Sequence, residues 1–366
     1  MPDPRVRTLA DVLCRYSLDV QPGDLVRVDG PVHAQPLFVE LTRVITERGG
    51  QPWLRPQLPA VGRILLEHGS DELLERTTRL DELDTDLPDK VLTIWSPENT
   101  RALSGIPGER LARYNGARRA LVERFFERMA TGDAQWCGTA FPWHAQAQEA
   151  GMALAEWEDF VYGAGHLEDP DPVAHWQEQS RRQARVAERL SAASRLRIVG
   201  EDTDLAVDVG GRTWLNADGR QNFPDGEVYT SPHHEATEGH ISFAFASAYQ
   251  GHDVEGVRLW FQGGRVVREE ASKNADFLRR VLDTDEGARR LGEVAFGLNE
   301  QIQVATRDTL FDEKIGGTCH VALGMAFPEA GGENRSAIHW DLVCDLRRGG
   351  EVYADDELVF RDGSFL

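Results

Sequence analysis

The amino-acid sequence predicts an α/β N-terminal domain at residues 1–172 and a β-rich α+β C-terminal domain at residues 173–366. Helix and strand patterns alternate in the first part, whereas hydrophobic alternation with a period of two dominates after residue 195. Between them, residues 168–172 read Glu-Asp-Pro-Asp-Pro, and both prolines break regular structure. This run is the predicted junction, and the length suits two domains of roughly 100–200 residues each.

The N-terminal elements follow from the spacing of apolar residues. An amphipathic helix is predicted at residues 7–17, a short strand at 25–28, a helix at 35–50 and a buried strand at 90–95. Because strand, helix and strand follow in that order, we expect a layer of parallel strands. Two longer helices are predicted on either side of the junction, at 110–132 and 173–194.

The C-terminal elements are mainly strands. Period-two patterns predict strands at residues 205–209, 241–245 and 257–261, the last leading through Gln262-Gly263-Gly264-Arg265 into a hairpin. One helix is predicted at residues 274–291, followed by further strands at 319–327 and 338–346.

The charge of the chain excludes several classes of function. It has 61 Asp and Glu against 40 Lys and Arg, a net charge of −21, which repels nucleic acid and anionic membranes. A hydrophobic content of 41% predicts folded cores rather than a disordered tail. No apolar stretch is long enough to span a membrane, and the first residues lack the pattern of a signal peptide. The four scattered cysteines predict free thiols in the cytoplasm.

Histidines provide the first candidates for chemistry. In His339-Trp340-Asp341 the first and third side chains share one face of a strand, and the apolar neighbours predict burial on both faces. A surface strand would explain His339 and Asp341 without a ligand, but buried polar groups need partners, and a metal ion is one. His320 precedes another apolar run, where a hydrogen-bonded core histidine is the alternative.

Two glutamates, like these histidines, lie next to turns, glycines or apolar runs. Glu227 follows the turn Asn222–Gly226, and Glu293 lies between Gly292 and an apolar run. Taken singly, Glu227 could be an ordinary loop acid and Glu293 could pair with an arginine. Together with His320, His339 and Asp341 they form an oxygen and nitrogen set that suits one or two ions of Zn²⁺, Mn²⁺ or Co²⁺. The neighbouring Cys319 is expected to face the core.

Several segments resemble the aminopeptidase T family of metallopeptidases, also called the thermophilic metalloprotease family. The similar segments follow one another in the family's order and reach into the N-terminal half, so the resemblance covers most of the chain. They are Asp19–Asp24, Ala147–Met152, Trp157–Phe160, Asn222–Val228, Leu291–Glu293, Leu310–Lys314, His320–Gly324 and Asn334–Asp341.

The resemblance implies an exopeptidase that removes N-terminal residues from short peptides. Its two divalent metal ions would be held by Glu227, Glu293, His320, His339 and Asp341. Glu227 or Glu293 would carry the proton during catalysis. The family also implies a two-domain homodimer whose metal site opens into an enclosed chamber.

One position departs from the family. A tyrosine that is thought to assist the transition state commonly stands where this chain has Phe327, and a phenyl ring donates no hydrogen bond. Either Tyr229, Lys314 or Arg335 replaces the missing donor, or peptidase activity is reduced or redirected. The rival functions are a metal-dependent oxygenase or lyase on the same scaffold and a metal-binding protein without catalytic activity.

Overall fold

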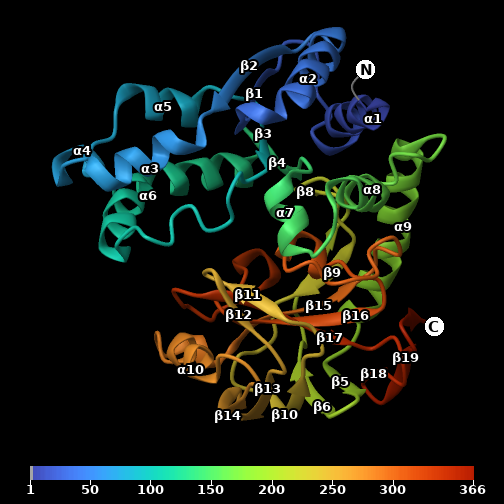
Figure 1. Cartoon of the computed structure of the whole chain (residues 1–366). Coiled ribbons are helices and arrows are strands. Elements are labelled where there is room, and N and C mark those ends of the chain that lie inside the picture. Colours follow the sequence, from blue (N-terminus) through green and yellow to red (C-terminus); the bar gives the residue numbers. More distant parts are fainter. Residues whose placement is uncertain (1–2) are drawn as a thin grey trace. The chain divides into compact units, whose positions relative to one another are not determined.

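The computed structural model describes residues 3–366, which form two compact units (Figure 1). The first unit comprises the chain up to Ala174 together with Gly219–Pro224. The second comprises His175–Asp218 and Asp225–Leu366. Within residues 3–366, no helix combines the length and the apolar character needed to cross a membrane.

The first unit contains a parallel sheet of five strands in the order β2-β1-β3-β4-β8. The predicted α/β organisation is therefore confirmed. The apolar stretches at 25–28 and 90–95 form central strands, as their sequences indicate. The strands are β1 Leu25–Pro31, β2 Gln51–Gln57, β3 Lys90–Trp95, β4 Gln135–Ala140 and β8 Asn222–Phe223.

Helices connect these strands. Leu37, Leu41, Val44 and Ile45 on α2 are buried, as their helical spacing predicts. By contrast α6 has no fully buried residue among those described, and Phe126 is 60% exposed. The helices are α1 Pro4–Val12 with a π-helical turn Leu13–Ser17, α2 Gln35–Glu47, α3 Pro59–His68, α4 Asp71–Glu75, α5 Arg79–Asp86, α6 Gly108–Thr131, α7 His144–Glu149 and α8 Leu154–Ala164.

The second unit is built from antiparallel sheets, which confirms the β-rich character predicted for it. It begins within helix α9, Pro172–Ser191. An eight-stranded sheet has the order β14-β13-β10-β6-β5-β18-β19-β20, and a five-stranded sheet has the order β17-β16-β15-β9-β7. The larger sheet contains β5 Arg195–Gly200, β6 Thr203–Asp208, β10 Glu238–Ser242, β13 Arg258–Gln262, β14 Arg265–Glu270, β18 Glu351–Ala354, β19 Glu357–Arg361 and β20 Ser364–Phe365.

The five-stranded sheet carries all five candidate metal ligands. Its strands are β7 Leu215–Ala217, β9 Glu227–Thr230, β15 Leu291–Gly297, β16 Thr318–Gly324 and β17 His339–Asp345. A small two-stranded sheet, β11 Ser247–Tyr249 and β12 His252–Val254, completes the unit together with the short helices α10 Ala275–Leu282 and α11 Thr309–Asp312.

Two predicted elements end earlier than expected. The helix predicted at 274–291 is only α10, because the Asp285 carboxylate accepts hydrogen bonds from Ala288, Ser336 and Ala337 and these hold the chain in a turn. The strand predicted at 319–327 ends at Gly324, whose φ of +101° interrupts extended backbone. Phe327 therefore lies in a loop.

Alternation along the strands gives the five-stranded sheet two different faces. One face packs into the hydrophobic core through a set of apolar residues: Val228, Val294, Phe296, Cys319, Val321, Leu323, Trp340, Leu342 and Cys344. Cys319 faces this core, as predicted. The residues between them point to the opposite face. Cross-strand pairs agree, because Ala322 pairs with both Glu293 and Asp341, while Ala295 pairs with His320.

A bulge at Gly292 sets this register in β15. Leu291 pairs with Leu323 and Glu293 pairs with Ala322, so Gly292 has no partner of its own and Glu293 turns to the polar face. A Cβ atom at Gly292 would lie 2.2 Å from the carbonyl oxygen of Met325. Only glycine therefore fits here without a shift of the backbone.

We expect Gly292→Ala to lower the free energy of unfolding by about 1–3 kcal/mol, because the added methyl group displaces the Met325 carbonyl. Chemical denaturation measures the change. The control is Gly210→Ala in the same unit, where an added Cβ meets its nearest neighbour at an ordinary 3.4 Å. Equal stability of the two variants would contradict the close approach at Gly292.

Candidate metal centre

The candidate residues come from four adjacent strands of the five-stranded sheet. Glu227 begins β9, Glu293 lies in β15, His320 lies in β16, and His339 and Asp341 lie in β17. Their shared face brings together five side chains that are separated in sequence by up to 114 positions, from 227 to 341. The predicted placement of His339 and Asp341 on one face of a strand is confirmed.

Burial at the site differs in one respect from the prediction. Glu227, Glu293 and His320 are buried, but the side chain of His339 is 25% exposed and that of Asp341 is 9% exposed. The expectation that residues 338–346 are buried on both faces is therefore wrong for the polar face. The reason is that β17 is the edge strand of this sheet.

The five side chains contact one another closely. Nε2 of His320 lies 3.4 Å from Oε2 of Glu227 and 3.7 Å from Oε1 of Glu293. Nε2 of His339 lies 3.3 Å from Oε2 of Glu293 and 3.3 Å from Oδ1 of Asp341. Glu293 thus stands between two imidazoles, each of which also faces one further carboxylate.

One backbone contact orients His339. Its Nδ1 lies 2.9 Å from the carbonyl oxygen of Met325, which can only accept a hydrogen bond, so Nδ1 is the donor. Nε2 of a neutral His339 then carries its lone pair toward Glu293 and Asp341. This second contact of the imidazole, to a backbone carbonyl, is typical of histidines that bind metal.

The fit to a metal ion rests on buried atoms that lack hydrogen-bond partners. Among the described residues, such atoms include Oε2 of Glu227, both ring nitrogens of His320 and Oδ1 of Asp341. Buried polar atoms normally have partners, and leaving them unpaired costs free energy. Glu293, His339 and Asp341 each also offer a ligand atom within 4.8 Å of the others. The donor set therefore fits divalent cations.

The side-chain ammonium group of Lys314 brings a buried positive charge to this site. Its side chain is 1% exposed, and Nζ lies 3.2 Å from Oε1 of Glu227 and 2.6 Å from Oε2 of Glu313. The sequence marks Lys314 only as a possible replacement donor and does not single out Glu313. Both residues lie in the segment Leu310–Lys314, and that segment was used only as part of the family resemblance.

The neighbouring charges shift the pKa values of the histidines. Burial lowers the pKa of His320, but Glu293 and Glu227 outweigh this effect and raise it to about 9. Burial also opposes the charge on His339, yet Asp341 and Glu293 raise its pKa to about 12. Without a metal ion, protons therefore occupy these imidazoles at neutral pH.

The carboxylates divide into two groups. Burial raises the pKa of Glu293 and Asp341, but the adjacent imidazoles prevail and lower both below the ordinary range. Burial raises the pKa of Glu313 well above its usual range despite the nearby Lys314. Glu293 and Asp341 are thus ionised and ready to bind a cation, whereas Glu313 favours its neutral form.

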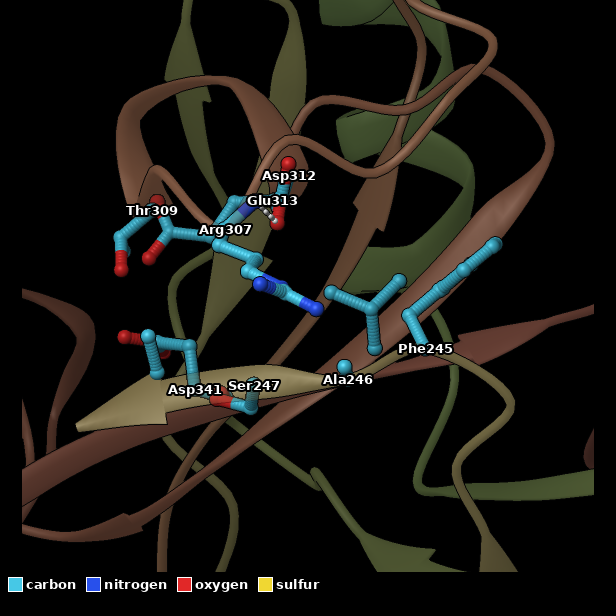
Figure 2. Close-up of a pocket in the computed structure, with 10 residues that line it drawn as sticks. Phe245, Ala246, Ser247, Arg307, Thr309, Asp312, Glu313 and Asp341 are labelled. Atoms are coloured by element: carbon cyan, nitrogen blue, oxygen red, sulfur yellow. Dashed lines mark hydrogen bonds between the residues drawn. The ribbon is translucent and has the colours of Figure 1, made fainter. Parts of the chain in front are cut away.

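A small pocket adjoins Asp341. In Figure 2 the Arg307 side chain projects into the space between the segment carrying Asp312 and Glu313 and the strand carrying Asp341. The volume of the pocket is about 20 Å³, which suits a water molecule and not an amino-acid side chain. The other residues around it are Phe245, Ala246, Ser247, Ala248, Thr309 and Val343.

Two aromatic rings border the candidate ligands. Phe327 packs edge-on against His339 with ring centroids 5.1 Å apart, and Tyr229 packs edge-on against Phe327 at 5.2 Å. Burial, with smaller contributions from Glu293 and Glu227, raises the pKa of Tyr229 above its usual range, so its hydroxyl stays protonated.

Carboxylates and imidazoles gathered on one face of a sheet, with no thiolate among them, are typical of metal-dependent hydrolases. Comparison with known families identifies which one. The chain belongs to the thermophilic metalloprotease family (M29), whose model matches residues 3–365. It is accordingly a peptide hydrolase, and the family implies a divalent metal.

Individual relatives match this chain over between about three quarters and nearly all of its length. The chain is 27% identical to aminopeptidase 2 of Geobacillus stearothermophilus, over 97% of this chain and 96% of the relative. It is 32% identical to aminopeptidase T of Thermus aquaticus, over 74% and 72%. The solved structure of wild-type AmpT from Thermus thermophilus matches with a TM-score of 0.85 and 26% identity, covering 99% of both chains.

Metal binding is expected to release protons from His320 and His339. Both pKa values are raised above the ordinary 6.5, so both rings are protonated at neutral pH and must lose a proton to bind metal. We expect release of at least about two protons, without a decline between about pH 6.5 and 8. Calorimetry of Zn²⁺ binding in buffers of different ionisation enthalpy measures it. Imidazoles with the ordinary pKa of 6.5 have already lost most of their protons at pH 8. A number of released protons that falls toward zero as the pH rises to 8 would therefore contradict the raised pKa values.

Replacing Lys314 with methionine tests its role as a buried counter-charge. Because Glu227 then loses its cation, we expect the metal-free variant to be less stable by about 3–5 kcal/mol. Added divalent metal should stabilise Lys314→Met more than the unmodified protein, since the ion supplies positive charge. Lys273→Met is the control, because Lys273 is exposed and its ion pairs lie at the surface, where such pairs contribute little to stability. An equal metal-induced rise in Tm for both variants would count against this role.

Proposed function

We propose that this enzyme is an aminopeptidase that removes N-terminal residues from short peptides at a centre of two divalent metal ions. The proposed ligands are Glu227, Glu293, His320, His339 and Asp341, and the ions are Zn²⁺, Co²⁺ or Mn²⁺. The observation that carries the proposal is the position of Glu293 between two imidazoles.

The contacts support two half-sites that share Glu293. Glu227 and His320 would form one with Oε1 of Glu293, and His339 and Asp341 would form the other with Oε2 of Glu293. A carboxylate that faces two sets of donors suits a bridge between two ions. The names of the curated relatives, aminopeptidase 2 and aminopeptidase T, support removal of N-terminal residues.

The chemistry divides between the ions and the chain. Bound divalent ions would lower the pKa of a water molecule and stabilise negative charge on the scissile carbonyl oxygen. Glu227 or Glu293 would move the proton from that water to the leaving amine. Both oxygens of each glutamate have a neighbour: Lys314 and His320 contact Glu227, and the two imidazoles contact Glu293.

The surroundings of the site support a substrate with a free amine. Asp341 lines the small pocket, and an ionised carboxylate attracts the charged N-terminus of a peptide. We also propose that the enzyme is a cytoplasmic homodimer. Cys14, Cys319 and Cys344 keep free thiols, as in a reducing compartment, and exposed apolar side chains such as Leu58, Leu80 and Phe126 offer surface for a partner.

The experiment removes the metal with a chelator, reloads the protein with Zn²⁺, Co²⁺ or Mn²⁺, and follows hydrolysis of leucine p-nitroanilide and its N-acetyl derivative. We expect metal-dependent release from the free amine only. His339→Ala should lower kcat by roughly 10²-fold or more, because it removes a proposed ligand. His68→Ala is the control, since that side chain is 75% exposed.

Three results would contradict the proposal. They are turnover that resists complete metal removal, full activity of His339→Ala, and stoichiometric metal binding without hydrolysis of any N-terminal residue. Iron binding with oxygen consumption would instead indicate the rival oxygenase function.

A further inference from the structure

We propose that Tyr229 is a catalytic residue whose hydroxyl donates a hydrogen bond to the carbonyl oxygen of the substrate as that oxygen becomes negatively charged. The inference rests on the proposed function and adds a residue to its site. It follows from the register of the sheet, the packing of the tyrosine ring and the lack of a hydrogen-bond partner for the hydroxyl among residues 3–366.

The register places Tyr229 on the polar face of the sheet. It follows Glu227 by two positions in β9, so both side chains leave the strand on the same side. Tyr229 pairs with Ala295 in β15, and Ala295 pairs with His320 in β16. Cross-strand partners share a face, so only the methyl group of Ala295 stands between Tyr229 and His320 in this row. A tyrosine side chain is long enough to extend across it.

Packing fixes the ring beside the candidate ligands. Tyr229 contacts Phe327 edge-on at 5.2 Å between centroids, and Phe327 contacts His339 in the same way at 5.1 Å. The loop carrying Phe327 is tied to the end of β9, because its backbone N–H donates to Oγ of Ser231 at 2.9 Å. The phenol is therefore held by the same loop and strand that border His339.

The hydroxyl of Tyr229 remains available. The residue is half-buried, and no protein group within residues 3–366 forms a hydrogen bond with its Oη. Tyrosine hydroxyls in such surroundings usually find a partner, as Tyr353 does with Glu351. An unpaired donor on the face that holds the candidate ligands is suited to an oxygen atom of the substrate.

The other possible donors near the site are less suitable. Lys314 is occupied, with Nζ between Glu227 and Glu313. Arg335 is exposed on the loop before β17, and Phe327 has no polar atom. Arg307 is exposed as well and lines the pocket beside Asp341. Tyr229 is the remaining candidate.

The step in which Tyr229 acts is the addition of water to the peptide carbonyl. The water oxygen forms a bond to the carbonyl carbon, and the π electron pair moves onto the carbonyl oxygen. Tyr229 stabilises that charge and keeps its own proton. When the C=O bond re-forms, the C–N bond breaks, and the leaving nitrogen takes the electron pair and the proton that the water lost.

The test compares Tyr229→Phe with the unmodified enzyme, both loaded with the same metal. We expect kcat for leucine p-nitroanilide to fall about 10²- to 10³-fold, with KM and metal content nearly unchanged. Affinity for a phosphinic analogue of a leucyl dipeptide, which carries the tetrahedral oxygens, should fall by a similar factor. Tyr353→Phe is the matched control, because it removes a hydroxyl from the other large sheet of the same unit.

A second variant separates a hydrogen bond from a structural effect. In Tyr229→Phe/Phe327→Tyr the hydroxyl moves to the adjoining ring, and we expect at least about a tenfold recovery of kcat over Tyr229→Phe alone. Tyr229→Phe with kcat within about threefold of the unmodified enzyme would overturn the inference while leaving the proposed function intact. If the unmodified enzyme hydrolyses nothing, the proposed function fails, and equal phosphinate affinity of the two proteins overturns the inference independently.

Discussion

Three carboxylates, Glu227, Glu293 and Asp341, are withdrawn from water on one face of a sheet, and their charge has to be balanced there. Isolated buried charges are costly, so each must meet a cation or a proton. Lys314 balances part of the charge through Glu227, and without metal the imidazoles take up protons, as their raised pKa values indicate. Divalent ions can replace those protons. The need to balance these negative charges explains why three features occur together: buried side-chain atoms without hydrogen-bond partners, a buried lysine, and histidines with raised pKa values.

The sheet gathers these charged side chains on one face because successive side chains along each strand point to opposite faces. Residues such as Val294 and Val321 anchor β15 and β16 in the core, and the residues next to them are thereby forced onto the opposite face. The site is thus built on strands that the core holds rigidly, and a slip of one residue in register would exchange the two faces. The bulge at Gly292 is the single irregularity in the pairing of β15 with β16, and it brings Glu293 into the polar row. Rigid donors suit a site that must hold cations in fixed positions.

The sequence predicts what is local. Alternation alone places His339 and Asp341 on one face, and the apolar runs mark the central strands of both units. It does not predict contacts between distant segments. Asp285 ends a helix by bonding residues about fifty positions later, and β8 joins the parallel sheet of the first unit although its neighbours in sequence belong to the second. The contact between Tyr229 and Phe327 likewise depends on pairing across the sheet, so from the sequence alone Tyr229 is one of several possible replacement donors.

The central claim is that these buried charges are balanced by two divalent ions that share Glu293. Anomalous X-ray diffraction from crystals of the zinc-loaded protein, recorded on both sides of the zinc absorption edge, tests it most directly. The account predicts two peaks among Glu227, Glu293, His320, His339 and Asp341, with Glu293 contacting both. A single peak that leaves two of the five side chains without contact to metal, or peaks located elsewhere in the protein, would contradict it.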